Sequence, residues 1–363
     1  MKRSPARPRF RRIAIGSGAA ATVCLVAIFV ARAIAQSWER DGRRIDPAEG
    51  IDSIEWIALG GVPQSVQIRG QYRRKPLLIW LHGGPGFPQM PFEEADRGLE
   101  QDFVVVHWDQ RGAGKSYRWG MRPAEMQVEQ FVADAHELVS LMLKRFGREK
   151  CFLVAHSWGS IVGAIEAARH SELFYAYIGV GQIADFPENE HARYDFALAA
   201  AAKDQNEQAL RELRRIGPPP HADMKSCVPM ERWVRFYAER EHPGLGAMMF
   251  VRLAFRSPDY SWIDLARIPA GYAFSYEALW REIYYDTNLF QRAPLIGTPV
   301  YLLVGRHDKV ALPSTVERYF DALEAPAGKK ILWFEASAHW PFIEEPAAFC
   351  DALRGIAAGN VVK

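Results

Sequence analysis

A serine in the middle of the chain has the sequence surroundings of a catalytic nucleophile. Ser157 follows an apolar run, residues 152–155, and precedes a helix-length segment, residues 161–169. Small residues stand two positions before and after it, Ala155 and Gly159, and they let a strand and a helix approach closely at a sharp turn. Because a serine on such a turn exposes its hydroxyl, the pattern predicts a nucleophile elbow, with alanine where glycine is usual. An ordinary tight turn is the alternative interpretation of this motif by itself.

An acid and a histidine each follow a later apolar run. Asp308 comes shortly after residues 300–304, and His339 comes shortly after residues 331–334. A serine nucleophile needs a base within hydrogen-bond reach, and that base needs a carboxylate to fix its tautomer and stabilise its charged form. Polar groups at the carboxyl ends of parallel strands meet at one edge of a sheet. We therefore expect Ser157, Asp308 and His339 to form a catalytic triad in that order along the chain.

A glycine-rich turn, residues 82–86 (HGGPG), follows the apolar run 77–81. With no side chains in the way, the backbone N–H groups of such a turn can face an anion. Fixed donors that stabilise the oxyanion of an acyl-transfer intermediate contribute about 2.7–4 kcal/mol each. A purely structural turn is the alternative, whereas a phosphate-binding loop is excluded because no Gly-Lys-Ser/Thr follows these glycines. We expect His82 to hold the turn rather than to react.

The segments between these motifs predict the scaffold. Residues 51–57 and 65–69 indicate a hairpin, with Gly60-Gly61 and Pro63 in its turn. Helix-length amphipathic stretches such as residues 128–146 separate several later apolar runs. These runs, each suited to a buried strand, lie at 77–81, 103–107, 152–155, 176–180, 300–304 and 331–334. The alternation predicts an α/β fold, with a mainly parallel sheet covered by helices on both faces.

The alternation breaks between residues 183 and 292. No strand-like run occurs there, Ala, Arg, Glu and aromatic residues are abundant, and a Gly-Pro-Pro-Pro stop stands at 217–220. We interpret this segment as an inserted helical cap that divides the core into a first part, 51–182, and a second part, 293–363. Its aromatic side chains either pack on the main body or line a substrate pocket.

The N-terminal segment has the composition of a membrane helix. Residues 13–30 carry no charge over eighteen positions, and residues 1–12 form a basic tail with six Lys or Arg and no acid. A helix of about 20 apolar residues crosses the hydrocarbon layer, and a basic flank stays in the cytoplasm. We therefore expect a transmembrane anchor at 13–35, a polar tether at 36–50 and the body on the extracytoplasmic side. A cleaved signal peptide ending near Ala35, with a secreted or periplasmic product, is the alternative, and a buried core helix is a third.

Composition limits the partners and cofactors. The chain has 45 Lys and Arg against 43 Asp and Glu, but without the basic tail the remainder holds 39 against 43. This mild acidity argues against nucleic acid as a partner, because phosphate neutralisation needs a concentrated basic face. The four cysteines lie far apart without metal-ligand spacing, so we expect no metal. The sequence does not identify which pair among Cys151, Cys227 and Cys350 could form a disulfide. The 49% share of hydrophobic residues excludes intrinsic disorder.

Together these motifs resemble the α/β hydrolase superfamily and, more narrowly, the prolyl aminopeptidase (proline iminopeptidase) family, over about residues 51–350. The resemblance is carried by 82–86, by 108–116 (WDQRGAGKS), by 156–160 (HSWGS), and by 305–308 (GRHD) with Ala338-His339. It implies a serine hydrolase that has a helical cap and needs no cofactor. It also implies that Ser157 is the nucleophile, His339 the base, Asp308 the group that orients the base, and the N–H groups of Gly84 and Trp158 the oxyanion hole.

The resemblance implies less about the substrate than about the catalytic triad. Prolyl aminopeptidases use cap carboxylates to hold the free amino group of a peptide, but residues 266–272 (ARIPAGY) contain no acid. Glu277 and Glu282 are then the candidates, with a solvated helix face as the alternative. We expect a small peptide substrate, and a carboxylesterase or lactonase on the same fold is the rival hypothesis. A non-catalytic membrane-anchored binding protein is the least favoured, because the triad is complete.

Overall fold

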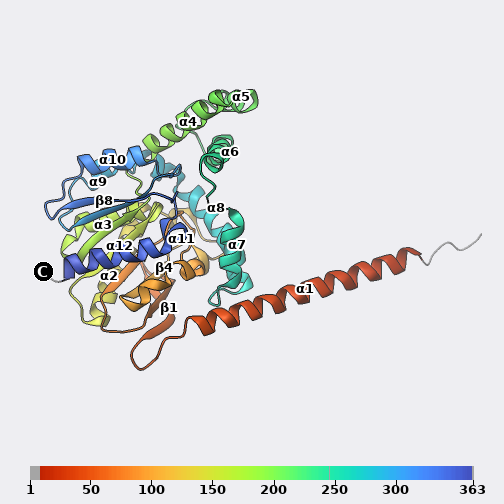
Figure 1. The fold of residues 1–363 in the computed structure, drawn as a ribbon, viewed down its shortest axis with the longest axis horizontal. Coiled ribbons are helices and arrows are strands. Elements are labelled where there is room, and N and C mark those ends of the chain that lie inside the picture. The colour runs from red at the N-terminus through yellow and green to blue at the C-terminus, as the bar shows by residue number, and fades with distance from the viewer. Residues whose placement is uncertain (1–8, 245, 362–363) are drawn as a thin grey trace, which may run out of the picture.

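The computed structural model describes residues 9–244 and 246–361, with side chains from residue 22 onward (Figure 1). Residues 1–8, which include Lys2, Arg3 and Arg7 of the predicted basic tail, lie outside the described residues. A mixed α/β body carries one long helix, α1 (Arg9–Gly42), which extends away from it (Figure 1).

Eight strands form a single sheet within the described residues, in the order β1-β2-β4-β3-β5-β6-β7-β8. The first two pairings are antiparallel and the others are parallel, so the predicted mainly parallel sheet is confirmed. The strands are β1 (Ile51–Leu59), β2 (Val62–Gly70), β3 (Leu77–Leu81), β4 (Val104–Asp109), β5 (Cys151–His156), β6 (Phe174–Val180), β7 (Val300–Gly305) and β8 (Lys329–Phe334).

The N-terminal hairpin turns more tightly than we expected. Gly60 and Gly61 have φ of 54° and 75°, the left-handed values that suit a two-residue hairpin turn, so Pro63 lies within β2 rather than in the turn. The pairing of β2 with β4 begins only at Ser65. Pro63 is therefore beyond the part of β2 where a missing N–H would break a ladder with β4.

Both faces of the sheet are covered, which explains why its strands are apolar throughout. Along β3, Leu77, Ile79 and Leu81 belong to one hydrophobic cluster and Leu78 and Trp80 to a second one on the opposite face. Helices α2 (Val128–Phe146), α3 (Trp158–Arg169) and α10 (Pro313–Ala322) contribute to the first cluster, and α11 (Pro341–Glu344) and α12 (Pro346–Val361) to the second.

The segment between β6 and β7 consists of helices and the turns that join them, with no named strand among its described residues, as expected for a cap. It contains α4 (Phe186–Lys203), α5 (Glu207–Ile216), α6 (Met224–Glu241), α7 (Ala247–Arg256), α8 (Trp262–Tyr285) and α9 (Leu289–Arg292). A third hydrophobic cluster joins α4, α5, α6 and α8 through buried aromatic residues such as Tyr194, Trp233 and Trp280. Phe274 of α8 packs against the main cluster of the body, and Phe250 lines a cavity. The two fates that we predicted for the cap aromatics therefore both occur, but many of these rings pack within the cap itself, which we did not predict.

The end of α1 departs from our prediction of a tether at residues 36–50. Residues 36–42 continue the helix, and two charged residues at its end, Glu39 and Arg43, are buried against the body. Glu39 accepts a hydrogen bond from Arg97 at 2.9 Å and also pairs with Arg256, while Arg43 forms two 2.6 Å bonds to Asp259. Composition alone predicted a linker because it does not reveal that these two charges have opposite partners on the body, whereas Asp41 and Arg44 are exposed and pair with each other.

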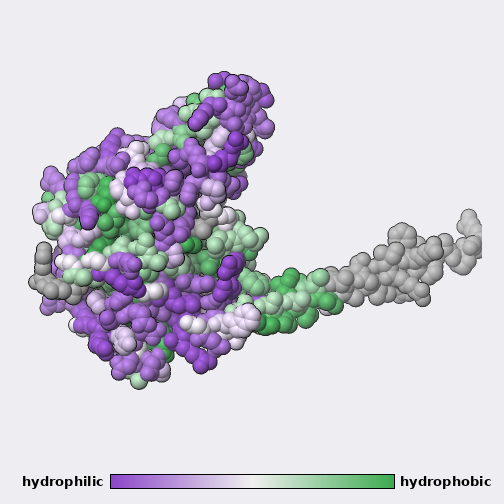
Figure 2. Space-filling model, in the orientation of Figure 1, coloured by the Kyte–Doolittle hydropathy of each residue, from purple (hydrophilic) through white to green (hydrophobic). Residues whose placement is uncertain are grey.

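Over Thr22–Gly42, a stretch that includes the docked end, α1 is long and apolar enough to cross a membrane, with a mean hydropathy of 1.3. Its exposed apolar side chains are Val23, Leu25, Val26, Ile28, Phe29, Val30 and Ile34. Figure 2 shows a hydrophobic stretch on the visible face of α1 where this helix leaves the body. By length and composition a membrane anchor and a signal sequence both fit this helix.

Candidate active site

Ser157 lies on a sharp turn between β5 and α3. Its φ of 53° and ψ of −119° are a strained conformation for a residue with a Cβ, of the kind that persists at functional sites. A Cβ on Gly159 would stand 2.4 Å from the carbonyl oxygen of Leu81, so this position has no room for a side chain. Ala155 is tolerated because Gly163 faces it, where a further Cβ would lie 2.6 Å away.

The other two predicted triad residues lie together at the carboxyl ends of β7 and β8. His339 Nδ1 donates a hydrogen bond to Oδ2 of Asp308 over 2.8 Å. Oδ1 of Asp308 accepts the backbone N–H groups of Val310 at 2.7 Å and Ala311 at 2.9 Å. These bonds fix a buried carboxylate against the imidazole, and the donation from Nδ1 leaves Nε2 of His339 as the proton acceptor.

Ser157 and His339 line one cavity of about 760 Å³ between the sheet edge and the cap. Gly84 and Trp158, the predicted sources of the oxyanion hole, line the same cavity. The structure thus brings the candidate nucleophile, the candidate base and the candidate oxyanion-hole donors to one cavity, and Asp308 is hydrogen-bonded to the candidate base. A cavity of this size falls within the range of small-molecule sites.

The glycine-rich turn is held against Ser157 by buried polar contacts. His82 Nδ1 donates to the carbonyl of Gly83 at 2.8 Å, and Nε2 accepts the backbone N–H of Gln110 at 3.0 Å. Burial lowers the pKa of His82 to about 4, so its ring is neutral, and it holds the turn as we expected. A Cβ on Gly83 would lie 3.2 Å from that of Ser157, which shows how closely the turn approaches.

The donors of the predicted oxyanion hole come from two different elements. Trp158 begins α3, and the first N–H groups of a helix have no partner within it. Gln110 joins the two elements, because its side chain donates to the carbonyl of His82 and accepts from Trp158 Nε1, both at 3.0 Å. We did not predict this role for Gln110, since a polar residue after β4 carries no signal of its partner.

Two further residues, Gly181 and His156, support the site, and we did not predict this role from the sequence. Gly181 follows β6 with a φ of 55° and stands against the His339 ring. His156 Nε2 donates to the backbone carbonyl of His339 at 3.0 Å, and burial holds its pKa well below the ordinary value. Gly181 limits the space beside the His339 ring and His156 holds its backbone carbonyl, so both residues help to position His339.

Comparisons with known proteins agree with this geometry. A model of the alpha/beta hydrolase family matches residues 78–352, most of the chain. The protein belongs to the alpha/beta hydrolase family. A probable aminopeptidase of Bacillus subtilis, YbaC, is 32% identical over 317 residues, which cover 85% of this hydrolase and 97% of YbaC.

Two solved structures share the fold of the hydrolase. A proline iminopeptidase of Mycobacterium smegmatis aligns with a TM-score of 0.63 at 19% identity, over 85% of this chain and 99% of its own. A bacterial membrane phospholipase A aligns with a TM-score of 0.61 at 19% identity, over 96% of this chain and 98% of its own. The expected fold, the expected hydrolase class and the resemblance to proline iminopeptidases are confirmed.

The cap carboxylates that we predicted for substrate binding are not those that reach the cavity. Oε2 of Glu282 accepts the N–H of Val128 at 2.9 Å and so caps the start of α2, and Glu277 is exposed. Neither Glu277 nor Glu282 is among the described residues that line the cavity. Both lie on α8, whose cavity side is instead occupied by residues such as Tyr272 and Tyr276.

Two other carboxylates, Glu190 of α4 and Glu231 of α6, line the cavity together with Arg193. Arg193 Nη1 is 2.6 Å from Glu190 Oε1, and its two Nη atoms bond Glu231 at 2.7 and 2.8 Å. Glu190 is 1% exposed, and its Oε2 has no hydrogen-bond partner among the described residues. Burial raises the pKa of Glu190, whereas for Glu231 the nearby Arg193 outweighs burial and lowers the pKa.

Aromatic rings form another wall of the cavity. Phe87, Phe250 and Trp340 meet edge to face, with centroids 4.9 to 5.8 Å apart. Such arrangements are favourable contacts between rings and present an apolar surface. The cavity of the hydrolase therefore combines an apolar wall with a small acidic cluster.

Proposed function

We propose that the hydrolase is a serine aminopeptidase that releases an N-terminal residue, proline or a similar apolar residue, from small peptides. His339 accepts the proton of the Ser157 hydroxyl as the oxygen attacks the carbonyl carbon of the substrate, and Asp308 stabilises the imidazolium. The N–H groups of Gly84 and Trp158 bind the oxyanion. His339 then protonates the leaving amine, and water, activated by the same base, releases the acyl group from Ser157.

The acidic cluster in the cavity is the observation that carries this proposal. Glu190, Glu231 and Arg193 carry two negative charges and one positive charge when ionised, so a substrate ammonium would neutralise them. Glu190 Oε2, buried and without a partner among the described residues, offers a place for an N–H of that ammonium. A neutral ester gains nothing from a buried carboxylate, which costs free energy when it stays unpaired. The name of YbaC, probable aminopeptidase, supports the same substrate class.

A carboxylesterase or lactonase is the second candidate. The aromatic wall of Phe87, Phe250 and Trp340 suits an apolar acyl chain, and the aligned membrane phospholipase A covers more of this chain than the aligned proline iminopeptidase does. Both candidates use the same triad and oxyanion hole. They differ only in whether the substrate carries a positive charge beside the reacting carbonyl.

The charge of the substrate therefore provides the test. We expect Glu190→Gln to raise KM for a prolyl arylamide by an amount equivalent to about 2–5 kcal/mol, the cost of truncating one partner of a buried charge pair. Glu231→Gln is expected to raise the same KM by less, because the side chain of Glu231 is half-exposed. KM for a neutral butyrate ester is expected to stay within a few fold. Glu277→Gln is the matched control, because it removes an exposed carboxylate of the same cap. Turnover of the ester but not of prolyl arylamides would leave only the esterase.

We also propose that α1 anchors the hydrolase in a membrane with its catalytic body on the extracytoplasmic side. The side chains of Arg32 and Gln36 donate to the carbonyls of Phe255 and Ser257 at 3.1 and 2.7 Å. The Ala33–Ala35 segment thus lies within a docked helix, which supports an uncleaved anchor over a cleaved signal. The exposed side chains of Met248 and Val251 on α7, a helix that contacts α1, add apolar surface beside it.

Protease accessibility tests this orientation. Protease added to intact spheroplasts is expected to digest the body, and alkaline carbonate is expected to leave the chain in the membrane fraction. Protection from protease would overturn the orientation, and release of a chain that begins near Gln36 would favour the signal peptide.

A further inference from the structure

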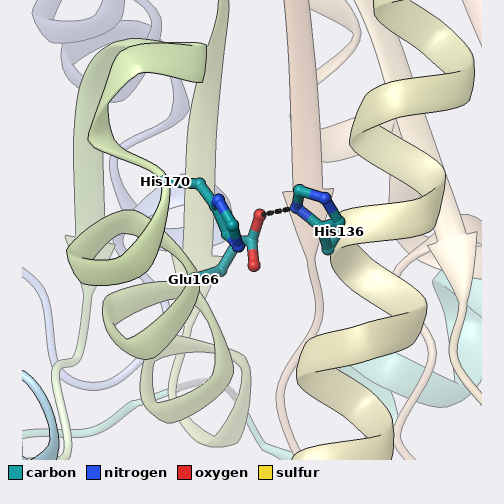
Figure 3. A group of neighbouring side chains, drawn as sticks. All are labelled: His136, Glu166 and His170. Carbon is teal, nitrogen blue, oxygen red and sulfur yellow. Dashed lines mark hydrogen bonds and ion pairs between the residues drawn. The ribbon is translucent and has the colours of Figure 1, made fainter.

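Two histidines and a glutamate meet between α2 and α3, and none of the three lines the catalytic cavity. Glu166 lies in the last turn of α3 and His170 caps that helix four residues later, so both are on one face. His136 faces them from α2 (Figure 3). One potential ligand atom from each of the three lies within 4.8 Å of those of the other two.

Glu166 is the unusual member of this cluster. Its side chain is 0% exposed, and Oε1 pairs with Nδ1 of His136 at 2.9 Å. Oε2 is buried and has no hydrogen-bond partner among the described residues. A buried carboxylate oxygen left unpaired costs free energy, and burial accordingly raises the pKa of Glu166. The guanidinium of Arg169, three residues later on the same helix, is directed to Glu129 at 2.7 and 2.9 Å.

The two imidazoles are free to adjust around this fixed carboxylate. The side chains of His136 and His170 are 40% and 35% exposed, and their ring centroids are 4.0 Å apart. Glu172 approaches His170 Nδ1 at 3.6 Å but is itself 68% exposed. The carboxyl end of a helix also favours a cation, and α3 ends at this cluster.

We propose that His136, Glu166 and His170 form a binding site for a divalent transition-metal ion, Zn²⁺ in the first instance, that ties α2 to α3. Two imidazole nitrogens and one carboxylate oxygen, with the fourth position left to water, are a ligand set that Zn²⁺ accepts at bonds of about 2.0–2.2 Å. The ion replaces the proton that His136 shares with Glu166 and gives the second carboxylate oxygen a neighbouring positive charge. Rotation of the exposed rings closes the remaining distance.

The site is structural rather than catalytic, because it lies at the opposite end of α3 from Ser157. His170 lies thirteen positions after Ser157, which corresponds to about 20 Å along a helix axis. Binding therefore stabilises the packing of α3, the helix whose first residue follows Ser157, without contact with a substrate. This makes stability, and not turnover, the informative readout.

The experiment measures the unfolding temperature of the purified, chelator-treated full-length chain with and without one equivalent of ZnCl2. We expect Zn²⁺ to raise Tm and a chelator to reverse the shift, because a ligand that binds only the folded state stabilises it. His136→Gln, His170→Asn and Glu166→Gln are each compared with their own metal-free form, so a change in basal stability does not obscure the shift. The matched control is His191→Gln, an exposed histidine on α4 whose ring contacts the carbonyl of Pro187.

The expected result is a Zn²⁺-dependent shift in the parent and in His191→Gln that is lost in the three cluster variants. In competition with a chromophoric indicator, their Zn²⁺ affinity is expected to fall at least about tenfold, since even partners that only orient ligands contribute 10–100-fold. Ester hydrolysis by His136→Gln is expected to be unchanged. A shift that survives in the cluster variants, or no shift in the parent, would overturn the proposal and leave the cluster as an ion pair between two helices.

Discussion

Gly181 lies so close to His339 that a Cβ at this position would stand 2.9 Å from Cε1 and 3.0 Å from Nδ1 of the imidazole. The same Cβ would be 3.5 Å from Oδ2 of Asp308. The glycine after β6 therefore sets where the base can sit, and no side chain fits there while the hydrogen bond between His339 and Asp308 stays in place.

From this contact we predict that Gly181→Ala lowers kcat at least about 100-fold, because a displacement of about 1 Å at a catalytic group costs that much. The matched control is Gly147→Ala, which has a similar left-handed φ of 61° but no atom within 4 Å of the added Cβ. Steady-state hydrolysis of a butyrate ester compares the two. Equal loss in both variants would mean that backbone strain, and not the position of His339, is responsible.

Asp308→Asn is expected to lower kcat by about 10⁴-fold with little change in KM, because the amide stabilises the wrong tautomer of the base. The backbone donors on Oδ1, Val310 and Ala311, remain compatible with the amide oxygen, so the fold is expected to persist. Circular dichroism checks the fold and burst kinetics check acylation. Retention of more than a tenth of the activity would place the orienting carboxylate elsewhere.

Arg193 is predicted to stabilise the folded protein in addition to lining the cavity. Replacing it with Met leaves Glu190 buried beside Glu231 with no counter-ion, and breaking a buried pair in this way costs about 3–5 kcal/mol. Arg211→Met, which removes an exposed guanidinium from α5, is the control. Urea denaturation measures the free energy of unfolding of both variants and of the parent. A loss below about 1 kcal/mol would show that the acidic cluster is open to water.

The raised pKa of Glu190 gives a pH dependence with a definite sign. A carboxyl group whose pKa is raised by burial becomes protonated at a higher pH than an ordinary glutamate, and the neutral form no longer attracts an ammonium. As the pH falls, KM for a prolyl arylamide is therefore expected to rise before KM for a neutral ester changes. Parallel pH profiles of the two KM values would remove Glu190 from substrate binding.

The parts of the site that the sequence could predict are those encoded in short stretches. The turn around Ser157 needs small residues within a few positions, and Asp308 and His339 each follow the end of a strand. Their meeting depends only on the rule that parallel strands end at one edge of a sheet. The alternation of helices and strands could also be predicted, because hydrophobic periodicity is encoded in short stretches of sequence.

The acidic cluster could not be predicted in this way, because it is assembled from two cap helices. Glu190 and Arg193 are spaced like an ordinary surface ion pair on one helix, and Glu231 joins them from another. No local pattern fixes how α4 and α6 are placed against each other, so Glu277 and Glu282 of α8 were equally plausible. The same limit applies to His136, which lies 30 residues before its partner Glu166.

Ser157 is the proposed nucleophile of this hydrolase, and peptide mass spectrometry after treatment with a fluorophosphonate identifies the residue that reacts. We expect an adduct on the peptide that contains Ser157 and no adduct in Ser157→Ala. Residual hydrolysis by that variant is expected to be below about a thousandth of the parent rate, since triad residues act as a unit. An adduct on a different residue, or labelling and turnover that persist in Ser157→Ala, would contradict this assignment.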